Sequence, residues 1–188
     1  MIERVLRIIK LDFGVFKEIE RDPDATVQAG MIVAVVSVLS GIGSAIAASM
    51  AQGGVGRPIM TFISEVIGGL VGWLAWSFIS YFVGKTLFNS KGTSEELLRV
   101  VGYANAPRLL GVLGFIPCLG WIAALAGAIL ALVASVMAIA EGLDLPTGQA
   151  VIVAVVGWIG LVIVMSIVGL VLGVGAAGLG ALTGAFTR

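Results

Sequence analysis

Two glutamates in this 188-residue sequence are placed where a carboxylate could do chemistry away from water. Glu65 lies inside a long apolar stretch and Glu141 directly follows another, and a carboxylate so placed could hold an ion or relay a proton. Glu65 could instead pair with Arg57, two helical turns earlier, or reach an aqueous interface. It lies only about 9 Å along a helix from the start of its stretch at Ile59, so we expect pairing or an interfacial position.

The sequence lacks the residues that the common catalytic sites require. The sequence contains no histidine, and Cys118 is its only cysteine. This excludes Ser-His-Asp and Cys-His nucleophile pairs, zinc sites of the usual Cys/His kind and an intramolecular disulfide. Phosphate-binding and dinucleotide-binding loops are missing as well. We therefore predict a protein that is not an enzyme and needs no metal or other cofactor.

A further set of polar residues surrounds a proline. Tyr103, Asn105 and Arg108 lie within six residues, and Pro107 interrupts the helix there. The segment follows a capping box, Thr93 with Glu96 three residues later. With charges near the N-terminus it forms the polar cluster that we predict to bind partners: Glu18, Glu20, Lys85, Glu95, Glu96, Arg99, Tyr103 and Pro107.

The composition indicates whether the helices around these residues are surrounded by water or by lipid. Hydrophobic residues make up 59% of the chain and charged residues 12%, against about 25% charged in soluble domains. The formal net charge is zero, so no basic excess favours nucleic acid. Of the 11 basic and 11 acidic residues, only Arg57, Glu65 and Arg188 lie outside residues 1–26, 85–108 and 141–144. We expect an all-α protein integral to a bilayer.

The uncharged stretches predict a polytopic bundle of five membrane helices, one of them short. The stretch 109–140 would be about 48 Å long as one helix, too long for a single crossing, and Pro117 divides it. Asp22 and Pro23 favour an N-cap before the first span. The membrane domain, 27–172, thus follows a cytosolic segment, 1–26, and precedes a Gly/Ala-rich tail, 173–188. The predicted spans are about 27–51, 59–84, 104–116, 121–140 and 149–172.

Basic residues predict the orientation, because Lys and Arg concentrate in cytosolic loops. Residues 1–26 and 85–108 hold nine of the 11 bases, so the N-terminus is expected in the cytosol. A four-span chain would move only the C-terminus to the other side.

The N-terminal segment predicts an amphipathic helix at the membrane interface. Its apolar residues recur at helical spacing between basic ones, which suits the cytosolic leaflet. The alternative is packing against the protein's own cytosolic loop. These apolar residues are Ile2, Val5, Leu6, Ile9, Phe13 and Phe16.

Glycine pairs one helical turn apart give some spans a small face. Gly68 with Gly72 and Gly169 with Gly173 have the spacing that lets helices approach closely in lipid. We expect packing within the bundle, and a homo-oligomer through these faces is the alternative.

Several short motifs, in order, resemble one family. They are Val15–Pro23 before the first span, Tyr81–Lys85 at the end of the second, Glu95–Arg99, Gly102–Ala104 with Pro107, and Glu141 after the fourth. Their order and spacing over most of residues 10–170 resemble the YIP family, the Ypt/Rab-GTPase-interacting integral membrane proteins, in its prokaryotic branch.

The resemblance implies five membrane helices, a cytosolic N-terminus and no enzymatic chemistry. Eukaryotic relatives act in Golgi and endoplasmic-reticulum vesicle traffic and carry an Asp-Leu-Tyr-Gly-Pro motif. Here Asp12-Phe13-Gly14-Val15 lacks its tyrosine and proline, which argues against GTPase binding. The short termini suggest a prokaryotic cytoplasmic membrane; in a eukaryote the Golgi or endoplasmic reticulum would be expected.

The function expected from these features is non-enzymatic. The protein would organise or shape membrane, or scaffold other membrane proteins, through its cytosolic face. The alternative is a small-solute or ion transporter, a channel or a lipid scramblase that uses Glu65, Glu141 and the broken helix at Pro117.

Overall fold

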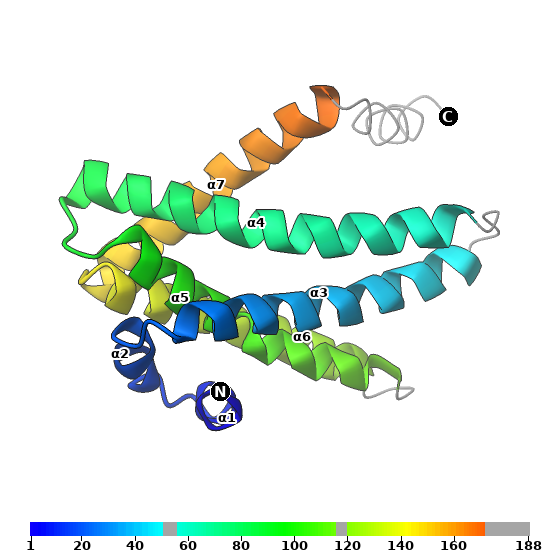
Figure 1. The fold of residues 1–188 in the computed structure, drawn as a ribbon, viewed down its shortest axis with the longest axis horizontal. Helices are drawn as coiled ribbons and strands as arrows, with labels where there is room; N and C mark the ends of the chain where they lie inside the picture. The colour runs from blue at the N-terminus through cyan, green and yellow to red at the C-terminus, as the bar shows by residue number, and fades with distance from the viewer. Residues whose placement is uncertain (51–55, 116–119, 172–188) are drawn as a thin grey trace.

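The long apolar stretches form long helices, and the last of them crosses the others obliquely (Figure 1). The structure is a computed structural model that describes residues 1–50, 56–115 and 120–171; Pro117, Cys118 and the tail 173–188 lie outside these ranges. Within the described part, four helices are long and apolar enough to cross a membrane. They are α3 (Ala25–Met50), α4 (Gly56–Phe88), α6 (Gly120–Gly142) and α7 (Thr147–Val171), each within four residues of a predicted span (Figure 1).

The predicted short span at 104–116 is a 3₁₀ helix. Helix α5 (Ser94–Ala104) ends at the residues before Pro107, and η1 (Ala106–Phe115) continues the path. Pro107 lacks the N–H that an α-helix would need, and the Asn105 side chain donates to the carbonyl of Val101 at 3.0 Å. Ten residues of 3₁₀ helix span only about 20 Å, less than a hydrocarbon core of ~30 Å. The total of five crossings therefore stays a prediction.

The chain after α4 runs through α5 and η1 towards the opposite end of the bundle, and α6 returns antiparallel to them (Figure 1). The loop before α5 lies against the end of α6, since a Cβ on Gly92 would be 2.0 Å from the carbonyl oxygen of Gly142. Segment η1 packs along α6, and α5 contacts α3, α4 and α6. We call the end that holds the N-terminus of α5 and the C-terminus of α6 the polar end.

The N-terminal segment consists of two short helices, α1 (Ile2–Ile9) and α2 (Val15–Glu20) (Figure 1). Leu11, with φ of 66°, turns the chain between them, so the predicted helix is not continuous. In α2, Val15, Phe16 and Ile19 are fully buried against α5 and α6. The alternative interpretation of the N-terminal sequence is packing against the protein's own cytosolic loop. The contact of α2 with α5, which lies in that loop, agrees with this alternative.

Close contact between α3 and α4 occurs at a glycine beside the predicted pair. A Cβ on Gly69 would lie 2.9 Å from the Cβ of Ser37, whereas Gly68 and Gly72 have nothing within 4 Å of that position. Gly102 likewise meets Ala29, whose Cβ would be 2.5 Å away. The small residues that bring helices together are thus on a different face of α4 from the one expected.

The difference in packing between Gly69 and Gly68 allows a matched test of the contact between α3 and α4. We expect Gly69→Ala to lower the free energy of unfolding by about 1–3 kcal/mol, because the added methyl group forces α3 and α4 apart. Gly68→Ala should leave it unchanged or raise it by up to about 1 kcal/mol through helix propensity. Thermal or denaturant unfolding in detergent measures both, and equal effects of the two substitutions would contradict the packing described.

Candidate functional site

Arg99 joins three elements at the polar end. Its Nε donates to Oγ1 of Thr26 at 2.8 Å, and Nη1 donates to the backbone oxygen of Glu20 at 2.8 Å. The side chain is 11% exposed, and Nη2 lies 3.5 Å from a carboxylate oxygen of Glu95. Because Glu20 ends α2 and Thr26 lies in the first turn of α3, one guanidinium on α5 holds the N-terminal segment onto the bundle.

A second set of contacts holds α1. Nη1 of Arg4 lies 2.6 Å from Oδ2 of Asp22, and this guanidinium lowers the pKa of the aspartate. Asp22 also accepts from the backbone N–H of Asp24, as an N-cap would, although α3 begins only at Ala25. Nearby, the buried Tyr103 hydroxyl donates to Oε1 of Gln28. Tyr103 is thus a packing residue rather than an exposed contact.

Glu96 and Glu95 have different roles despite their adjacency. The capping box predicted from Thr93 and Glu96 is confirmed: the N–H of Thr93 donates to Glu96 at 2.7 Å, and the N–H of Glu96 donates to Thr93 at 3.2 Å. The Glu95 side chain is 77% exposed. Glu95 is therefore available to a partner, whereas Glu96 also secures the start of α5.

The remaining members of the predicted cluster lie apart from one another. Glu18 accepts from Arg7 at 2.8 Å on the surface of the N-terminal segment. Lys85 donates to the backbone oxygen of Ser90 at 2.9 Å, with its Nζ 5.9 Å from the centre of the Tyr81 ring. Pro107 is buried in η1. The eight residues are thus spread over separate elements, from the N-terminal segment to η1, and do not form one cluster.

Three carboxylates from two other parts of the chain act on Glu20 at the polar end. Burial raises the pKa of Glu20, and the negative charges of Asp144, Glu96 and Glu141 raise it further. We call these four residues the acidic rim. Asp144, in the turn after α6 with φ of 52°, was missed by sequence reasoning; its position three residues after Glu141 was the available signal.

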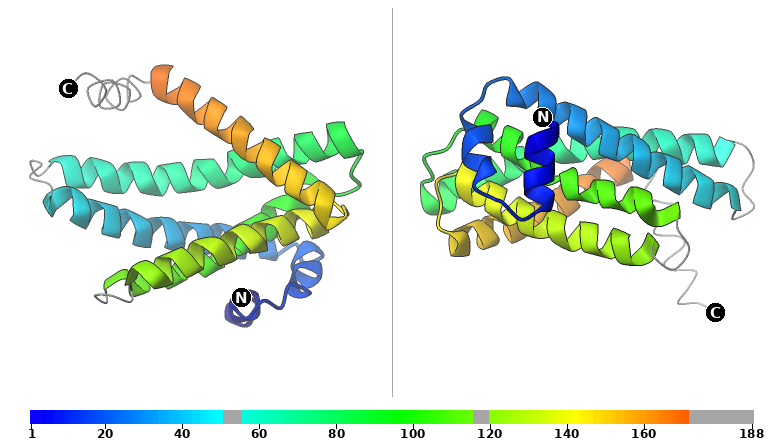
Figure 2. Two further views of the ribbon diagram at one scale, coloured as in Figure 1. Left: turned by 180° about the vertical axis from the view of Figure 1, so that it is seen from behind. Right: turned by 90° about the horizontal axis from the view of Figure 1, so that it is seen from below.

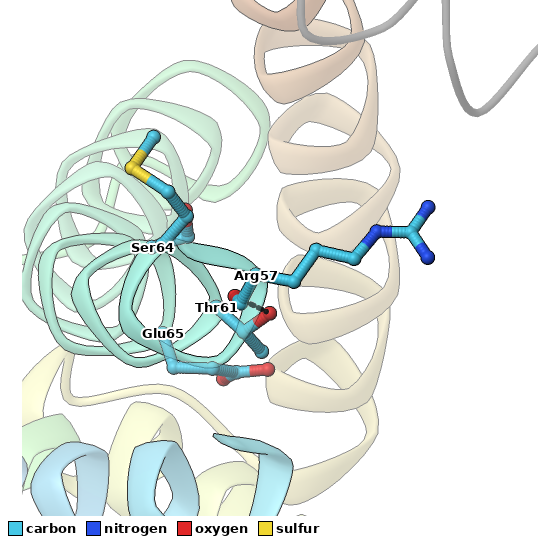
Figure 3. Close-up of a pocket in the computed structure, with 5 residues that line it drawn as sticks. Arg57, Thr61, Ser64 and Glu65 are labelled. Atoms are coloured by element: carbon cyan, nitrogen blue, oxygen red, sulfur yellow. Dashed lines mark hydrogen bonds between the residues drawn. The ribbon is translucent and has the colours of Figure 1, made fainter. Parts of the chain in front are cut away.

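Glu65 lies towards the opposite end of the bundle. Figure 3 shows it in the first turns of α4, with the Arg57 side chain pointing away from it. Its carboxylate accepts from the Ser44 hydroxyl on α3 at 3.3 Å, and among the described residues it forms no ion pair with Arg57. It borders an open depression of about 470 Å³ lined by Arg57, Met60, Thr61, Ser64 and Glu65.

The two candidate intramembrane carboxylates therefore do not form a joint site. Glu141 belongs to the acidic rim, whereas Glu65 accepts from Ser44 and borders the depression at the start of α4. Over the described ranges, no group of three histidine, cysteine or acidic side chains could hold a metal ion. The polar end is therefore a charged surface whose shape is fixed by the contacts of Arg99 and Arg4.

Removing the Arg99 contacts should detach α2. We expect Arg99→Met to lower the free energy of unfolding by roughly 2–4 kcal/mol, because hydrogen bonds to a charged group are lost and their partners stay partly buried. Hydrogen exchange should accelerate in residues 15–20 and remain unchanged in α7. Lys91→Met, on an exposed side chain, is the control; unchanged exchange in α2 of the Arg99 variant would contradict this role.

The acidic rim should make stability depend on pH through Glu20. A carboxyl group whose pKa is raised by folding destabilises the folded state once it ionises, so the penalty appears as the pH rises through the folded pKa. We expect Glu20→Gln to raise the melting temperature at neutral pH. The gain should fade as the pH drops below about 4, where glutamate becomes protonated in either state. Glu3→Gln, on the exposed side of α1, is the control; a gain independent of pH would contradict the explanation.

Comparison with known proteins supports one family. A family model described as the Yip1 domain matches residues 13–170, from just before α2 to the last residues of α7. Comparisons with curated proteins and with solved structures found no significant match. The match takes in most of the chain, and the apolar helices fit an integral membrane protein. The chain therefore belongs to the Yip1 domain family.

Proposed function

We propose that the protein is a non-enzymatic scaffold that holds partner proteins at the cytosolic face of a membrane. The observation that carries the proposal is the concentration of charge at the polar end on a framework fixed by buried contacts. Arg99 and Arg4 attach α2 and α1 to the bundle, so the surface keeps one shape without a ligand. A fixed surface binds a partner at lower entropic cost than a flexible one.

The acidic rim defines the chemistry of such a partner. Burial raises the pKa of Glu20, and the negative charges of Asp144, Glu96 and Glu141 nearby raise it further. A basic segment of a partner protein would relieve this repulsion, whereas anionic headgroups would add to it. We infer that the rim faces a protein, and that the bilayer contacts other parts of the molecule.

The orientation of this surface follows from the basic residues. Nine of the 11 bases lie in residues 1–26 and 85–108, which supports a cytosolic polar end by the positive-inside rule. A prokaryotic cytoplasmic membrane is the location that we propose. The partners would then be other membrane or cytosolic proteins rather than GTPases of vesicle traffic.

The proposal is tested by reversing charge on the rim. We expect Glu141→Lys combined with Asp144→Asn to reduce in-cell crosslinking to specific partners by about tenfold or more, as for close charge pairs at interfaces. These positions are chosen because Glu96 also caps α5 and Glu20 adjoins the Arg99 contact. Crosslinked proteins are identified by mass spectrometry.

Arg57→Glu, at the opposite end of the bundle, is the matched control and should leave the crosslinked set unchanged. Thermal unfolding of each variant in detergent verifies that the fold is intact. An identical partner set for the folded rim variant and the parent protein would contradict the proposal.

A further inference from the structure

Helix α1 lies crosswise to the helices that are candidates for crossing the membrane. Figure 1 shows it nearly end-on, and in the right-hand view of Figure 2 it runs across the direction of α3 and α4. It packs beside η1 and is fixed to the start of α3 by Arg4 and Asp22. In a protein whose long helices cross the bilayer, a helix in this orientation lies parallel to the membrane plane.

The apolar side of α1 is only partly covered by the protein. Ile8 is fully buried, and Val5 packs against the core. On the uncovered part of this side, Ile2 is 71% and Leu6 50% exposed, one helical turn apart, and Leu11 just after the helix is 53% exposed. We call Ile2 and Leu6 the outer face of α1. The apolar side of this helix thus extends beyond the part that the protein covers.

We propose that the outer face of α1 inserts into the boundary between headgroups and acyl chains of the leaflet next to the polar end. The crosswise orientation and the membrane location of the protein select lipid as the occupant. A helix in this position with one polar and one apolar side is the geometry of interfacial helices. The proposal concerns lipid alone and does not depend on the scaffold function.

The charges around α1 indicate how it binds. Arg4 pairs with Asp22, and Arg7 pairs with Asp12 and Glu18, so both guanidinium groups are neutralised by the protein itself. Attraction to anionic headgroups is correspondingly reduced. The binding is therefore driven by burial of the outer face, and it should occur in a zwitterionic bilayer as well.

Spin labels on α1 test this contact. In a Cys118→Ser background, nitroxides are attached to Ile2→Cys and Leu6→Cys, with Lys17→Cys on the exposed side of α2 as control, in phosphatidylcholine vesicles. We expect collisions with oxygen, which concentrates in lipid, to exceed those with a water-soluble nickel chelate at both α1 positions. At Lys17→Cys, collisions with the nickel chelate should exceed those with oxygen.

Two results would overturn the proposal. Nickel-chelate collisions at Ile2 and Leu6 as frequent as those at Lys17 would place the outer face in water. Low accessibility to both reagents, with dipolar broadening that disappears when unlabelled protein is added, would identify a second copy of the chain as the occupant. Two labelled positions keep the test valid if one substitution disturbs α1.

Discussion

The guanidinium of Arg99 is the contact on which the arrangement of the polar end depends. A buried charge is costly unless hydrogen bonds compensate for lost hydration, and here a carbonyl oxygen and a hydroxyl do so. Those acceptors lie 79 and 73 residues from Arg99 in the sequence, so the contact forms only when α2, α3 and α5 have met. The charged surface is consequently a property of the folded membrane domain and not of a separate tail.

The membrane part is held together by different forces. Apolar burial between helices gains little in lipid, so close approach and hydrogen bonds determine which helices pair. Ser37 packs closely against Gly69, and Ala29 packs closely against Gly102. The Trp73 indole donates to the carbonyl of Leu98 at 3.1 Å. These contacts fix α5 between α3 and α4, and this position places Arg99 within reach of the N-terminal segment.

Charge segregation and apolar length predicted the long helices, because a bilayer demands about 20 apolar residues for each crossing. The capping box at Thr93 was equally predictable, since it depends on residues three apart. The acidic rim was not, because its four carboxylates converge only in the tertiary fold. The face of α4 that contacts α3 could not be predicted either. The spacing favoured Gly68 and Gly72, but in the folded bundle Gly69 makes the close contact. Pro107 predicted a break, though not the 3₁₀ helix that follows it.

The central claim is that α2, the loop before α5 and the turn after α6 share one side of the membrane. Impermeant thiol labelling in intact cells tests it most directly, with single cysteines at Lys17, Lys91 and Asp144, and at Arg57 on the opposite end, in a Cys118→Ser background. The account predicts that the first three are protected or labelled together and that Arg57 behaves oppositely. Labelling of Asp144 from the side of Arg57 would contradict it.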